Sequence, residues 1–110
     1  MDIKKYQKEA IKTAIHPKKF KIIYPAIGLG NETGELMGKI KKWMRGDYGK
    51  GKISKEKRES IKGELGDVLW YLATLATDLG LSLDDAAQEN LKKLKSRKQK
   101  NLIKGDGDKR

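Results

Sequence analysis

The sequence predicts an all-α protein with four main helices, in which the second and third form a central antiparallel pair. Three observations support this prediction. Apolar residues recur at helical spacing in four stretches. Serines that can cap a helix stand before two of these stretches, and glycine or proline separates all four. With 110 residues and no cysteine, the chain has the size of one domain and no disulfide framework.

The first helix is expected from Asp2 to His16, where apolar residues fall close to helical spacing. Pro17 ends this helix or bends it just before the proline. Residues 1–22 are therefore interpreted as an N-terminal helix and a basic connector. The lysines of the connector form either a solvated turn or a surface that attracts an anionic substrate.

The second helix is expected to begin near Tyr24 or Pro25 and to run to about Arg45. It contains four glycines, each costing roughly 0.5–1 kcal/mol relative to alanine: Gly28, Gly30, Gly34 and Gly38. Close approach of a neighbouring helix or a ligand would compensate for this cost. The alternative is a frayed or broken start before Asn31.

A glycine-rich basic loop over residues 46–52 lacks the spacing of a phosphate-binding P-loop and is interpreted as a linker. Ser54 is the expected cap of the third helix, and Gly80 closes that helix. Ser82 is the expected cap of the fourth helix. Residues 99–110 are expected to form a flexible tail.

Two pairs of acidic residues are the candidate functional groups of the sequence, namely Glu32 with Glu35 and Glu64 with Asp67. Residues three apart in a helix lie on one face, so packing the two helices together would gather four carboxylates. Such like charges repel one another unless protons or a cation neutralise them. Oxygen-only ligands suit a hard ion such as Mg2+, or Mn2+ in its place. These residues therefore predict a metal site, with a solvated acidic face as the alternative.

The 26 basic residues outnumber the 15 acidic ones, which gives a formal net charge of +11. This excess attracts polyanions or phosphorylated small molecules. The first twenty residues lack the apolar block of a signal peptide, and the longest mainly apolar stretch, 68–77, is about half a bilayer-spanning helix. We expect a soluble, cytoplasmic protein. Its small core also favours a homo-oligomer.

Three segments, 28–35, 39–42 and 64–71, together resemble the MazG-like nucleoside triphosphate pyrophosphohydrolases, an all-α superfamily. The defining pattern is E-x-x-E followed, after a variable gap, by E-x-x-D. Residues 90–94 with Arg97, and the Gly-Asp-Gly-Asp-Lys-Arg ending, resemble the closing segment of phage and bacterial members. The likeness covers roughly Tyr24 to Arg110 and implies a single four-helix MazG-like domain over 1–110.

This resemblance implies hydrolysis of a ribo- or deoxyribonucleoside triphosphate to the monophosphate and pyrophosphate. It implies Mg2+ bound by Glu32, Glu35, Glu64 and Asp67, with Glu35 as the candidate catalytic base. The candidate substrate-binding residues are Lys39, Tyr71, Asn90, Lys93 and Arg97. Relatives commonly form dimers or tetramers, and housecleaning of nucleotides or control of a phage nucleotide pool are the implied roles.

Two other functions remain open from the sequence. The basic charge fits a helical nucleic-acid-binding module, whose affinity would fall with salt and would not depend on metal. A catalytically silent nucleotide sensor would also keep the fold. A di-iron carboxylate bundle is disfavoured because Glu-x-x-His pairs are absent from the sequence. Trp43, Trp70 and Tyr71 either stack on a base or fill the core.

Overall fold

The computed structural model describes residues 1–101 and 104–108, and all the regular structure in this part of the chain is helical. The elements are α1 (Ile3–Ala10), the short 3-10 helices η1 (Ile11–Thr13) and η2 (Lys18–Phe20), α2 (Ile23–Met44), α3 (Lys55–Asp78) and α4 (Leu83–Gln99). The prediction of an all-α protein with four main helices is confirmed.

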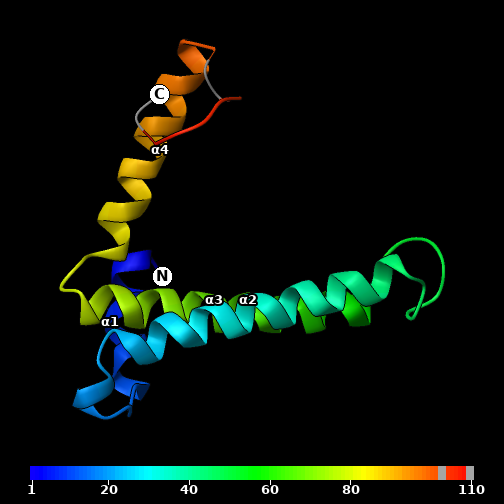
Figure 1. Cartoon of the computed structure of the whole chain (residues 1–110), viewed down its shortest axis with the longest axis horizontal. Coiled ribbons are helices and arrows are strands. Elements are labelled where there is room, and N and C mark those ends of the chain that lie inside the picture. Colours follow the sequence, from blue (N-terminus) through cyan, green and yellow to red (C-terminus); the bar gives the residue numbers. More distant parts are fainter. Residues whose placement is uncertain (102–103, 109–110) are drawn as a thin grey trace.

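Helices α2 and α3 lie side by side and antiparallel, and they form the long arm of the molecule (Figure 1). Helix α1 packs against α3 at one end of this pair. From the same end, α4 extends away from the pair and does not run along it (Figure 1). The two long helices therefore form the scaffold that positions any site on their facing surfaces.

Short polar side chains begin the helices as the sequence predicts. The side chain of Ser54 accepts a hydrogen bond from Lys57 N, and that of Ser82 accepts one from Asp85 N. Gly80 has φ +70°, which suits a residue that ends a helix in the left-handed region. Helix α2 is continuous from Ile23 to Met44, so the alternative of a break before Asn31 is wrong.

The first helix is shorter than predicted. It ends at Ala10, a single 3-10 turn follows to Thr13, and Ala14 is already extended. The prediction extended this helix to His16. Pro17 disfavours helical backbone at His16, and the chain instead places the imidazole against the C-terminal end of α3.

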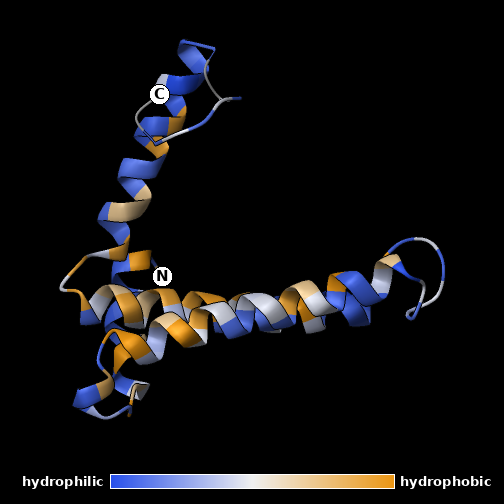
Figure 2. Cartoon of the chain, in the orientation of Figure 1, coloured by the Kyte–Doolittle hydropathy of each residue, from blue (hydrophilic) through white to orange (hydrophobic). Residues whose placement is uncertain are grey.

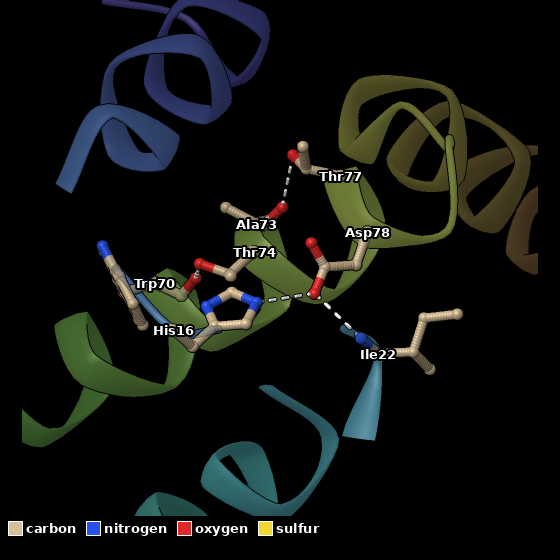
Figure 3. Close-up of polar contacts among 7 residues, drawn as sticks. All are labelled: His16, Ile22, Trp70, Ala73, Thr74, Thr77 and Asp78. Atoms are coloured by element: carbon tan, nitrogen blue, oxygen red, sulfur yellow. Dashed lines mark hydrogen bonds and ion pairs between the residues drawn. The ribbon is translucent and has the colours of Figure 1, made fainter. Parts of the chain in front are cut away.

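Asp78 joins the connector to the end of α3 (Figure 3). Its Oδ2 accepts a hydrogen bond from Ile22 N at 2.9 Å and lies 2.9 Å from His16 Nε2. Burial acts to raise the pKa of Asp78, but the hydrogen bonds from Ile22 and His16 outweigh it and hold this pKa below its ordinary value. The same contact supports Ile22 at φ +70°, a strained conformation for a β-branched residue.

We expect Asp78→Asn to lower the free energy of unfolding at pH 7 by about 1–3 kcal/mol, because the buried anion that accepts from Ile22 N is lost. A lowered folded pKa gives stability that is present above the ordinary pKa and is lost as the pH falls through the folded value. Urea unfolding at several pH values tests this. The difference from the native protein should shrink below about pH 4, whereas Asp106→Asn in the exposed tail should change little at any pH.

A large apolar surface stays exposed in the single chain. The accessible area is 8730 Å², whereas a compact monomer of 12.4 kDa has about 6100 Å². Hydrophobic segments follow α2 and α3, most densely at the end nearest α1 (Figure 2). Exposed large side chains lie on all three long helices, among them Ile27, Met37, Leu65, Leu72, Leu91 and Leu94. Within the described residues, the fully buried side chains are few and small, namely Pro25, Ala73 and Thr74.

None of the described helices combines the length and the apolar character that crossing a bilayer requires.

Candidate metal centre

Three of the four predicted carboxylates meet between the two long helices. Glu32 and Glu35 lie one turn apart on α2, and Glu64 faces them from α3. One carboxylate oxygen from each lies within 4.8 Å of the others. Because α2 and α3 run antiparallel, residues about thirty positions apart in the chain come together here. We call these three residues the carboxylate cluster.

Asp67 lies at the edge of the carboxylate cluster and outside its closest grouping. It is exposed and stands one turn after Glu64 on α3. Its negative charge nevertheless reaches Glu32, whose pKa it helps to raise. The structure thus places the four predicted acids in one region, three of them tightly and the fourth beside them.

The electrostatics of the cluster suit a cation. Burial, followed by the charges of Glu35 and Asp67, raises the pKa of Glu32 above its ordinary value. Glu32 Oε2 and Glu64 Oε2 are buried without a hydrogen-bond partner. Buried carboxylate oxygens without partners are costly unless something neutralises them. An oxygen-only set with two such atoms fits Mg2+ or Mn2+, which prefer hard oxygen ligands.

Lys39 borders the cluster on α2. Its Nζ lies 3.2 Å from Glu64 Oε1 and donates a hydrogen bond to Ser60 Oγ. The sequence suggested Lys39 as a substrate contact, whereas in the single chain its ammonium group binds α3. Ser60 was not among the candidates, although its position one turn before Glu64 on the same helix face is a signal that the sequence contains.

Tyr71 packs against α2 close to the cluster. A Cβ atom added at Gly28 would lie 2.1 Å from Tyr71 Cε1, so the ring occupies the space that this glycine leaves open. The ring also lies 6.3 Å from that of Tyr24. An apolar groove here is lined by Phe20, Ile23, Tyr24, Ile27, Gly28, Asn31 and Tyr71. Tyr71 therefore packs against α2 and also lines an open groove close to Glu32.

The two tryptophans make contacts that hold the fold together. Trp43 Nε1 donates a hydrogen bond to the carbonyl oxygen of Gly51 in the loop between α2 and α3. Trp70 Nε1 donates to Thr13 Oγ1 and so ties α3 to the end of η1. These contacts favour the structural interpretation of both residues.

The candidate residues on α4 are not brought to the carboxylate cluster within one chain, because α4 extends away from the α2–α3 pair (Figure 1). Asn90 is exposed. Lys93 Nζ lies 2.7 Å from Asp108 Oδ1, and the buried Arg97 guanidinium donates to the backbone carbonyl and the carboxylate of Asp108. The predicted flexible tail therefore contacts α4 at Asp108, while residues 102–103 and 109–110 lie outside the described part.

Comparisons with known proteins identify the family of the chain. Residues 26–102 match the family model described as the MazG nucleotide pyrophosphohydrolase domain. The chain is also similar to the Gene 37 protein of Mycobacterium phage L5, with 40% identity over 116 aligned positions that span 100% of both chains. No solved structure matches the chain significantly.

Proposed function

Because the chain belongs to the MazG nucleotide pyrophosphohydrolase family, we propose that it hydrolyses a nucleoside triphosphate to the monophosphate and pyrophosphate with the help of Mg2+. The substrate class includes ribo- and deoxyribonucleotides, and clearing unwanted nucleotides from the cellular or phage pool is the proposed role. One observation carries the proposal: three carboxylates from two helices lie within 4.8 Å of one another, with two buried oxygens that have no hydrogen-bond partner.

Glu32, Glu35 and Glu64 would hold the metal ion, and Asp67 would support it from the edge of the cluster. When bound, the ion neutralises triphosphate charge and lowers the pKa of a bound water. Glu35 is the exposed member of the three, so it can accept a proton from the attacking water. Lys93 and Arg97, which bind the carboxylate of Asp108, have the charge and spacing to bind phosphate oxygens.

The test is pyrophosphate release from a panel of ribo- and deoxyribonucleoside triphosphates, with Mg2+, with Mn2+ and with a chelator. We expect metal-dependent cleavage of at least one nucleotide to its monophosphate. A folded, metal-loaded sample that is inactive on the whole panel would contradict the proposal. In that case the +11 charge would make salt-dependent nucleic-acid binding the next property to measure.

We further propose that the protein is a homo-oligomer, either a dimer or a tetramer. The accessible surface exceeds that of a compact monomer by about 2600 Å², and stable homodimers commonly bury about 2000 Å² or more. The radius of gyration of 17.0 Å is also larger than the value of about 13 Å for a compact chain of this length. The exposed side chains of α2, α3 and α4 are the apolar surface that such an assembly would cover.

We expect light scattering to give a mass of at least twice 12.4 kDa, with little change at high salt, because the exposed surface is apolar. Replacing Ile27 and Leu65 by Ser should shift the mass towards 12.4 kDa. A stable native species of 12.4 kDa would contradict the proposal.

A further inference from the structure

Among the described residues, one ammonium group forms an ion pair with the carboxylate cluster. Lys39 follows Glu35 by one helical turn on α2, and its Nζ crosses to α3, where it meets Glu64 Oε1 at 3.2 Å and the Ser60 hydroxyl. The two ends of this ion pair are well shielded, with side chains 28% and 14% exposed. By contrast, the Lys62–Glu59 pair on α3 has side chains 72% and 56% exposed.

Because this ion pair is shielded from solvent, the charge of Lys39 acts strongly on the carboxylate cluster. Exposed ion pairs are largely screened by solvent, whereas a charge at the edge of a shielded cluster is screened much less. Three carboxylates within 4.8 Å repel one another, and the Lys39 ammonium supplies a positive charge on the side of Glu64. The ammonium group therefore stabilises the cluster when no metal ion is bound.

The same contact opposes a divalent ion. Glu64 Oε1 already forms an ion pair with Lys39, while Glu64 Oε2 has no hydrogen-bond partner. An ion held by Glu64 must share that carboxylate with the ammonium, and the two cations repel each other at short range. The ammonium also donates a hydrogen bond to Ser60 Oγ on α3, so Lys39 can leave Glu64 and keep that hydrogen bond.

We propose that Lys39 is a positioning residue that serves as the resident counterion of the carboxylate cluster, holds Glu64 in the metal-free protein and lowers the affinity of the site for a divalent ion. The inference rests on the proposed metal centre but not on the hydrolysis of any nucleotide. It gives this lysine a role in metal loading, in addition to the substrate contact that the sequence suggested.

The test measures Mn2+ binding to the full chain by electron paramagnetic resonance, together with thermal unfolding in chelator. Lys39→Met removes the charge and keeps the length of the side chain. We expect it to bind Mn2+ about 3–10-fold more tightly and to have a lower melting temperature in chelator, so that Mn2+ raises its melting temperature more than that of the native protein. Lys62→Met is the matched control, because it removes an exposed lysine from an ion pair outside the cluster, and neither quantity should change.

Two further variants keep the test decisive. Lys39→Gln is neutral and can still donate to Ser60, so it should also tighten Mn2+ binding. It serves as the test variant if Lys39→Met does not fold. Lys39→Arg retains the charge and should bind Mn2+ within about twofold of the native protein. Unchanged or weaker binding in the neutral variants would overturn the role of Lys39. Absence of Mn2+ binding in the native protein would overturn the metal centre itself, and the inference with it.

Discussion

Glu35→Gln should lower kcat/KM for pyrophosphate release by about 100-fold or more in the presence of Mg2+. The substitution keeps the size of the side chain but removes a negative charge from a group of three carboxylates within 4.8 Å. Because Glu35 is exposed, its replacement should leave the helix pair folded. Steady-state pyrophosphate release against nucleotide concentration measures the effect, and circular dichroism verifies the fold.

Glu59→Gln is the matched control for this prediction. Glu59 lies on α3, pairs only at the surface with Lys62, and is outside the carboxylate cluster. Its replacement should leave kcat/KM within about twofold of the native value. Asp67→Asn should also reduce activity, since its charge acts on Glu32. Full activity in both Glu35→Gln and Asp67→Asn would show that the site has been assigned to the wrong residues.

Gly28→Ala should lower the free energy of unfolding by about 1–3 kcal/mol. The new Cβ would lie 2.1 Å from Tyr71 Cε1, a distance at which the ring or the helix must move. Displacing Tyr71 would also disturb its packing against Trp70, whose ring centroid is 5.0 Å away. This loss outweighs the gain of up to about 1 kcal/mol that alanine normally brings to a helix. Urea unfolding at neutral pH is the measurement.

Gly30→Ala, on the same helix, is the control for the glycine prediction. A Cβ there would have no neighbour within 4 Å, so the substitution should raise stability by up to about 1 kcal/mol. If Gly28→Ala were as stable as Gly30→Ala, Tyr71 would have to move aside at little cost. The close packing between α2 and α3 would then contribute little to stability.

Local signals in the sequence predicted much of the fold. Ser54 and Ser82 cap helices because a short polar side chain next to a run of helix-forming residues satisfies backbone amides within its own turn. The family resemblance is confirmed. Glu32 and Glu35 face Glu64 across the helix pair, while Asp67 lies at the edge of this group. These features depend on residues close together in the chain, or on one pairing of long helices.

The features that the sequence did not predict depend on distant contacts. After the short first helix, the connector docks on Asp78, 56 residues beyond Ile22. The direction of α4 is set where the chain turns between two helices, and no spacing in the sequence specifies it. Of the four glycines on α2, only Gly28 meets a close neighbour in the single chain. The engagement of Lys39 with Glu64 likewise follows from the register of α2 against α3.

The dependence of the connector on Asp78 also bears on the order in which the protein can form during translation. When Ile22 leaves the ribosome, the residue that will accept its amide hydrogen bond is still 56 codons away, a delay of several seconds at about 5–20 residues per second. Throughout that interval the docking surface of the N-terminal segment is incomplete, since the end of α3 that carries Asp78 has not yet emerged. The start of this chain is therefore made first and docks late, after the helix pair that carries the carboxylates is nearly complete.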